Sequence, residues 1–127
     1  MARKKSPTLT EGELRIMEVL WTLGRGTVAE VTQGMSHVPI AYNTVLTTLR
    51  ILEQKGHVAH EESGRAFIYR PLIGRDAAAQ SALKLVASKF FGNSTGALAL
   101  RLIENERPSD EELARLRSLV ERYEETP

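Results

Sequence analysis

Residues 40–56 carry hydrophobic and polar positions with a helical period, and this stretch organises the rest of the chain. At about 100° per residue, Val45, Leu49 and Leu52 fall on one narrow apolar stripe. The opposite face carries Asn43, Thr47, Arg50 and Gln54. Such short or planar hydrogen-bonding groups reach base edges in a DNA major groove, although composition alone also fits a core helix with a polar back. Lys55-Gly56 suits the helix end, where glycine takes the left-handed conformation.

Two shorter helices are expected upstream, because capping boxes stand at Thr10–Glu13 and Thr27–Glu30. The first helix should run to about Leu23, with an apolar side made of Leu14, Met17, Val19, Leu20 and Trp21. The second should cover 28–34 and bury Val28, Val31 and Met35.

After Gly56 the period becomes alternating, which predicts two strands, Val58–Glu62 and Ala66–Arg70, joined by a glycine-containing turn. Three short helices followed by a β-hairpin are typical of a winged helix-turn-helix, whose third helix enters the major groove. Arg65 stands at the hairpin turn, where a cation meets sugar-phosphate or the minor groove. The alternative for Arg65 is a solvated turn residue.

The chain after Asp76 is predicted to be helical. These helices carry too many apolar residues to lie alone in solvent. We expect helices from Asp76 to Phe91, after a cap at Asn93 or Ser94, and after the capping box Ser109–Glu112. The candidate dimerisation residues are Leu83, Val86, Phe90, Phe91, Leu98, Leu102, Ile103, Leu113, Leu116, Leu119 and Val120. A second copy of the chain is the natural partner, and the alternative is packing back on the same chain's N-terminal domain.

The predicted fold is therefore mainly α with a small β-hairpin: a winged helix-turn-helix DNA-binding domain over residues 1–74 and a C-terminal helical dimerisation domain over 75–127.

The two parts of the chain differ slightly in net charge. Residues 1–75 hold ten Lys/Arg against seven Asp/Glu (+3), and residues 76–127 hold seven against nine (−2), so the N-terminal part is the better candidate for facing a polyanion. Arg3-Lys4-Lys5 is either a phosphate-contacting arm or a frayed terminus.

Composition excludes several classes of protein. There is no cysteine, so disulfides, thiolate metal sites and cysteine nucleophiles are absent. No segment approaches the apolar length of a membrane span, and we expect a cytoplasmic protein without membrane insertion. His57 and His60 should point to opposite faces of a strand, and His37 is isolated, so neither a metal site nor catalysis is predicted. We expect no enzyme and no cofactor.

The residues themselves suggest a division of DNA contacts. Asn43, Thr47 and Arg50 are candidates for base edges or adjacent phosphates, and Leu46 for a thymine methyl group. Tyr42, Thr44 and Thr27 are candidates for phosphate contacts. The expected partner is double-stranded DNA with a palindromic operator, because a twofold protein matches a twofold site.

Three stretches now carry a resemblance: Leu9–Trp21, Ala41–Gly56 and Gly64–Leu72. Together the chain resembles the BlaI/MecI/CopY family of bacterial penicillinase-type repressors, most strongly from Ala41 to Leu72. The resemblance implies a dimeric winged-helix repressor on a dyad-symmetric operator. It also implies release when a membrane sensor-protease, activated by a β-lactam, leads to cleavage in the dimerisation helices.

The chain departs from the family pattern at three places. Antibiotic-responsive members are cut at an Asn-Phe bond, and the matching position here is Arg101-Leu102, so the resemblance does not specify how this chain is induced. The copper-responsive branch uses C-terminal cysteines, which this chain lacks. Leu46 stands where the antibiotic repressors have Arg, which suggests a different operator. The alternatives are a small-molecule-responsive winged-helix regulator and a winged-helix protein-interaction module.

Overall fold

The computed structural model describes residues 8–35 and 38–125, so the basic arm at Arg3 and the isolated His37 lie outside the described residues. The chain forms two compact units, Met1–Leu85 and Val86–Pro127. The division falls inside a helix, C-terminal to the sequence-based boundary at residue 74. No helix among the described residues has the length and apolar character needed to cross a membrane.

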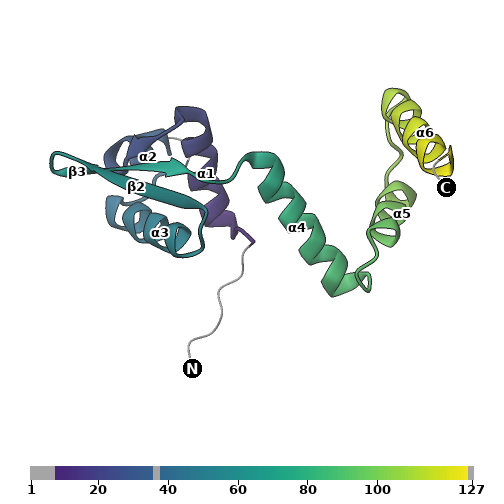
Figure 1. Ribbon diagram of the computed structural model, residues 1–127, viewed down its shortest axis with the longest axis horizontal. Helices are drawn as coiled ribbons and strands as arrows, with labels where there is room; N and C mark the ends of the chain where they lie inside the picture. The colour runs from purple at the N-terminus through teal and green to yellow at the C-terminus, as the bar shows by residue number, and fades with distance from the viewer. Residues whose placement is uncertain (1–7, 36–37, 126–127) are drawn as a thin grey trace. The chain divides into compact units, whose positions relative to one another are not determined.

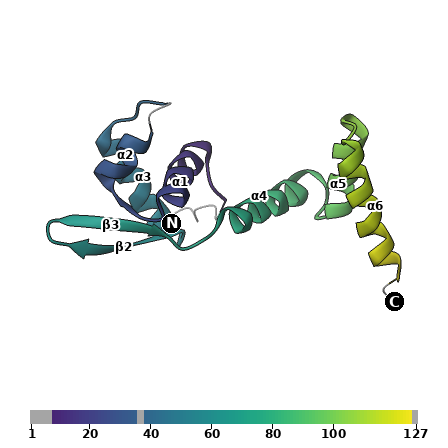
Figure 2. The same ribbon diagram turned by 90° about the horizontal axis from the view of Figure 1, so that it is seen from above.

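The first unit contains three complete helices, a small antiparallel sheet and the N-terminal part of α4 (Arg75–Phe90) (Figure 1). The elements that precede α4 are, in chain order, α1 (Glu11–Leu23), β1 (Gly26–Thr27), α2 (Val28–Gly34), α3 (Tyr42–Gln54), β2 (Val58–Ser63) and β3 (Ala66–Pro71). The strand order is β1-β3-β2. Figure 2 shows the β2–β3 hairpin extending past the helices as a wing. The predicted winged-helix architecture is confirmed, and the two-residue strand β1 is an addition that the sequence did not indicate.

Local sequence signals set the helix ends. In both predicted capping boxes, the threonine hydroxyl accepts a hydrogen bond from the amide of the glutamate three residues later, and the glutamate accepts from the threonine amide, at Thr10 and at Thr27. Gly24 and Gly56 have positive φ, +84° and +85°, which a side chain disfavours and glycine allows. The boundaries predicted for α1 and α2 are confirmed. Helix α3 is shorter than the predicted helix over 40–55, because Ala41 is its N-cap and Lys55 its C-cap.

One apolar cluster holds the three helices against the sheet. Its members are Ile16, Met17, Leu20, Val28, Val31, Met35, Val45, Leu49, Leu52, Val58 and Tyr69. The predicted buried stripe of α3 and the predicted buried residues of α2 belong to it. On α1 the prediction was wrong at Leu14, which is 40% exposed, whereas Ile16 is fully buried. The reason is helical phase: Ile16, Met17 and Leu20 share the face that meets α3.

Gly34 allows a very close approach between α2 and α1. A Cβ atom built on Gly34 would lie 2.5 Å from Cγ1 of Val19, closer than van der Waals radii permit. Only glycine fits at this contact without a shift of one helix or of the Val19 side chain.

Three helices follow the sheet. They are α4 (Arg75–Phe90), α5 (Thr95–Asn105) and α6 (Asp110–Glu125). Ser94 caps α5, and Ser109 with Glu112 forms the predicted capping box of α6. Neither α5 nor α6 contains a buried residue, so the apolar side chains of both helices are exposed or only half-buried in the single chain.

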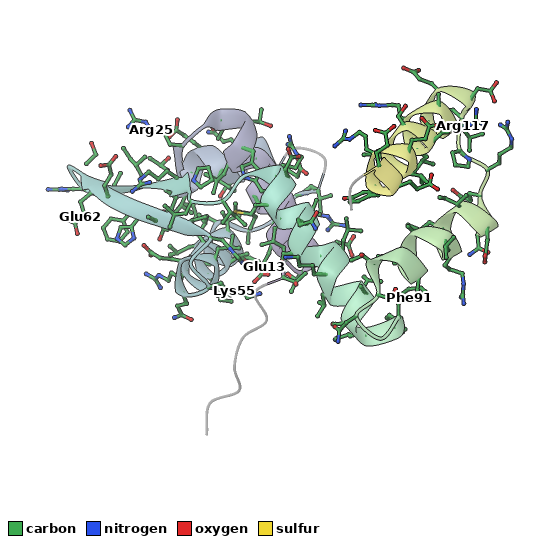
Figure 3. The ribbon with its side chains drawn as sticks, turned by 45° about the vertical axis from the view of Figure 1, so that its right-hand side comes forward. Glu13, Arg25, Lys55, Glu62, Phe91 and Arg117 are labelled. Atoms are coloured by element: carbon green, nitrogen blue, oxygen red, sulfur yellow. The ribbon has the colours of Figure 1, made fainter. Side chains whose placement is uncertain are left out.

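A buried ion pair joins the start of α1 to the end of α3. Lys55 Nζ lies 2.8 Å from Glu13 Oε1, with only 6% and 7% of the two side chains exposed (Figure 3). Glu13 Oε1 also accepts from the Thr10 amide at 2.8 Å, and Lys55 Nζ donates to the Thr8 carbonyl at 3.3 Å. Burial raises the pKa of Glu13, but the hydrogen bonds from Lys55 and Thr10 outweigh it and leave this pKa below its ordinary value. The C-terminal end of α3 is thereby fixed to the start of α1.

Replacing the cation of this pair should destabilise the first unit strongly. Lys55→Met keeps an apolar stem but leaves the Glu13 carboxylate buried and unpaired, a change that costs about 3–5 kcal/mol of unfolding free energy. Urea titration followed by the fluorescence of Trp21 measures it. The matched control is Arg15→Ala, which removes the exposed pair with Glu11 and should cost roughly 0–1 kcal/mol. Equal effects of the two substitutions would contradict the prediction.

The same ion pair should make the free energy of unfolding depend on pH in the acidic range. Because the pKa of Glu13 is lower in the folded chain than its ordinary 4.5, its contribution is fully present above pH 4.5 and is lost as pH falls through the lowered folded pKa. The unfolding free energies of the wild type and of Glu13→Gln, measured from neutral pH down through that window, should therefore converge. A constant difference at every pH would rule this mechanism out.

Candidate nucleic-acid interface

Helix α3 separates the residues that hold it from the residues that it displays. Val45, Leu49 and Leu52 are fully buried in the core, whereas Asn43, Thr47 and the other polar candidates of this helix are exposed. The burial of one stripe fixes the rotation of the helix about its axis. It therefore decides which polar side chains face outward.

The start of α3 differs from the starts of α1 and α2. Its N-cap is Ala41, which makes no side-chain cap hydrogen bond, because alanine has no side-chain oxygen. The Ala41 carbonyl accepts from the amides of Thr44 and Val45. The amides at the first turn of a helix otherwise need an outside acceptor, and such amide groups with the helix dipole favour an anion.

An open depression lies where α3, the start of α2 and the hairpin turn meet. Its volume is about 350 Å³. Its lining consists of Thr27, Val28, Ala29, Tyr42, Leu46, Arg50, Arg65, Ala66 and Phe67. Five predicted contact residues, Thr27, Tyr42, Leu46, Arg50 and Arg65, are thus brought together from three separate parts of the sequence. The other three, Asn43, Thr44 and Thr47, lie on the exposed surface of α3 but do not line the depression.

Strand β1 positions Thr27 beside the wing. Thr27 pairs with Ile68 of β3, which places the N-terminus of α2 next to the hairpin. The Thr27 hydroxyl accepts from the Glu30 amide at 3.1 Å, and the Thr27 amide donates to Glu30 Oε1 at 2.9 Å. The hydrogen bond from the Thr27 amide lowers the pKa of Glu30. A hydrogen bond from the Thr27 side chain lowers this pKa as well, so the capping box holds Thr27 in place beside the hairpin.

The hairpin turn places Arg65 at the tip of the wing. Gly64 has φ +63°, as a two-residue hairpin turn requires, and Arg65 beside it is exposed. The neighbouring Glu61 lies 3.7 Å from Arg25, but both side chains are more than half exposed, so this pair contributes little. Figure 3 shows Glu62 toward the end of the hairpin, so the hairpin end carries acidic side chains as well as Arg65.

A histidine that sequence reasoning left without a role joins the wing to α3. His60 Nδ1 lies 2.6 Å from Glu53 Oε2, and its ring lies 4.5 Å from the ring of Phe67 and 5.4 Å from that of Tyr69, centroid to centroid. Burial, with the nearby Glu53 carboxylate, raises the pKa of Tyr69. His57 was expected on the same strand but precedes β2 and is buried. The described residues contain no cluster of three metal-ligating side chains.

The candidate dimerisation residues all lie in α4, α5 and α6 or directly after α4. Leu83, Val86, Phe90, Leu102, Ile103, Leu119 and Val120 are exposed, and Phe91, Leu98, Leu113 and Leu116 are half-buried. Arg101 places its guanidinium 5.7 Å from the centroid of the Phe91 ring, within the second unit. The candidate cleavage position, Arg101-Leu102, is exposed and lies inside the helical span of α5.

Comparison with known proteins connects this geometry to a family. A family model described as "Penicillinase repressor" matches residues 9–122. The penicillinase repressor of Bacillus licheniformis is 27% identical over 121 residues, which cover 94% of each chain. The solution structure of the DNA-binding domain of the repressor BlaI matches with a TM-score of 0.50 and 32% identity, over 57% of this chain and 90% of that chain.

A more distant likeness concerns the fold alone. The crystal structure of a mutant MarR from E. coli has a TM-score of 0.50 and 18% identity, over 91% of this chain and 77% of that chain.

Proposed function

The chain belongs to the penicillinase repressor family, and from that premise we propose that it represses transcription in the cytoplasm as a homodimer on a two-fold symmetric DNA site. The family consists of DNA-binding transcriptional repressors and not of enzymes. The observation that carries the proposal is the depression in which Arg50, Arg65 and Thr27 meet beside the exposed face of α3. Cations and hydroxyl groups so arranged suit a polyanion whose bases lie between two phosphate backbones.

In this proposal α3 lies in the major groove of each half-site. Asn43, Thr47 and Arg50 contact base edges, and the half-buried Leu46 offers its exposed atoms to a thymine methyl group. The first turn of α3, which has no side-chain cap, receives a phosphate, and Tyr42 and Thr44 flank that phosphate. Thr27 and Arg65 contact the backbone on either side of the groove.

The second unit supports the homodimer part of the proposal. Phe90 is 77% exposed, Leu102 58% and Val120 56%, and large apolar groups in such number mark an association surface. A second copy covers the same faces on both chains and matches a palindromic site. Release by cleavage at Arg101-Leu102, with a membrane sensor-protease as partner, requires that α5 first opens locally, because proteolysis acts on opened segments.

Removal of Arg50 and removal of Arg65 should change DNA binding in different ways. Arg50→Ala should cost roughly 1–3 kcal/mol of binding free energy and relax specificity at one base pair. Arg65→Ala should weaken all sequences alike and reduce the salt slope by about 1. Selection from random duplexes, followed by gel-shift titration at two salt concentrations, measures both effects. Unchanged sequence preference in Arg50→Ala would remove Arg50 from the base-reading set.

The dimer surface should be sensitive to one charge. Val120→Asp on the apolar side of α6 should shift the sedimenting mass at micromolar concentration from twice the chain mass toward 14.1 kDa, since an unpaired carboxylate at an apolar interface is costly. Affinity for the selected duplex should fall by about a hundredfold when two-site binding is lost. Ser118→Asp, an exposed position of the same helix, is the matched control and should leave both unchanged. A wild-type chain that sediments as a monomer would contradict the proposal.

A further inference from the structure

The segment that joins β3 to α4 is fastened to α1 by one tryptophan and one arginine. Trp21 Nε1 donates a hydrogen bond to the Ile73 carbonyl at 2.8 Å. Arg75, the first residue of α4, places Cζ 5.1 Å from the centroid of the Trp21 ring. The same guanidinium reaches Glu18, with Nη2 2.5 Å from Oε2 and Nε 3.4 Å from Oε1. All of these residues lie within the first unit.

These contacts fix the position of the first residue of α4 more than they add to the free energy of unfolding. The Arg75 and Glu18 side chains are 57% and 46% exposed, so the ion pair alone contributes little. A guanidinium that is held by a carboxylate fork and also stacked on an aromatic ring nevertheless has a defined plane and position. Leu72 and Ile73, which lie between β3 and α4, are fixed as well. The Leu72 amide donates to the His57 carbonyl at 2.8 Å, and Ile73 packs on the core.

We propose that Glu18, Trp21 and Arg75 form a latch that sets the direction in which α4 leaves the winged-helix unit, and thereby the half-site spacing that the dimer accepts. Helix α4 runs from Arg75 to Phe90, and it carries Leu83, Val86 and Phe90 of the proposed dimer surface. The inference therefore rests on the proposed homodimer. Arg75 is a positioning residue in it and needs no contact with DNA.

The geometry of a duplex makes spacing a sensitive measure of such a latch. Moving one half-site by two base pairs rotates it by about 70° around the duplex axis. A dimer whose α4 is held in one direction cannot engage both half-sites after that rotation and loses the gain from two-site binding. A dimer with a loosened junction follows the rotation and keeps much of that gain.

The test measures binding to a spacing series. The probe is the duplex that the wild-type chain selects from a random pool, remade with up to two base pairs inserted or deleted between the half-sites, together with a duplex that carries one half-site. By fluorescence anisotropy, the wild type should bind the wrongly spaced duplexes about a hundredfold more weakly. Arg75→Ala and Glu18→Gln should each compress that ratio to about threefold or less, because two-site binding survives misplacement. Their affinity for the single half-site should stay within about twofold of the wild type.

Arg15→Ala is the matched control, because it removes an exposed arginine whose ion pair with Glu11 lies within α1. It should keep the wild-type spacing ratio. Retention of that ratio by Arg75→Ala and Glu18→Gln would overturn the latch, and so would an equal loss on all duplexes, which indicates a lost phosphate contact instead. Sedimentation distinguishes failure of the homodimer proposal from failure of the latch proposal. A monomeric wild type refutes the homodimer and the latch together, whereas dimeric variants with an unchanged spacing ratio refute only the latch.

Discussion

The buried pair between Glu13 and Lys55 is the contact on which the orientation of α3 depends most. The apolar stripe of Val45 and Leu49 fixes how α3 is turned about its axis, but an apolar stripe tolerates sliding, since hydrophobic contact has no direction. An ion pair in a nearly closed site has direction and length, and it is costly when broken. Here it joins the end of α3 to the capped start of α1, at Thr10. A single polar contact thus gives α3 a defined position along its own axis, which the register of side chains on a set of base pairs requires.

The remaining elements of the first unit extend that definition to the surface around α3. Strand β1 holds the start of α2 against β3 through the pairing of Thr27 with Ile68, and His60 ties β2 to Glu53 near the end of α3. As a result, the depression that contains Arg50 and Arg65 has walls from three elements, each attached to another by a polar contact as well as by the core. Basic residues on a rigid concave surface are already arranged for a polyanion, and less ordering entropy is lost on binding.

The parts of this fold that could be predicted from the sequence are those whose physical cause lies within a few residues. Capping boxes at Thr10, Thr27 and Ser109 are three-residue interactions, and the period of α3 is visible in its own sequence. Strand β1 could not be predicted, because two residues gain strand geometry only from pairing with the distant Tyr69 and Ile68. Lys55 fitted a helix end by its local position, and nothing local indicates that its partner is Glu13. The same limit applies to the interface: its residues on α3 were predicted together, whereas their meeting with Thr27 and Arg65 is a tertiary fact. Which of them touch DNA stays a prediction.

The glycine at the far end of α2 bears on the same surface. Helix α2 has only seven residues, and Thr27 caps its start. Gly34 at its end is packed so closely that a Cβ atom there would lie 2.5 Å from Cγ1 of Val19. A side chain at position 34 would force either the Val19 side chain or α2 itself to shift, and a shift of α2 would also move Thr27. Close packing at Gly34, which lies outside the depression and at the other end of α2, therefore helps to keep Thr27 in its place.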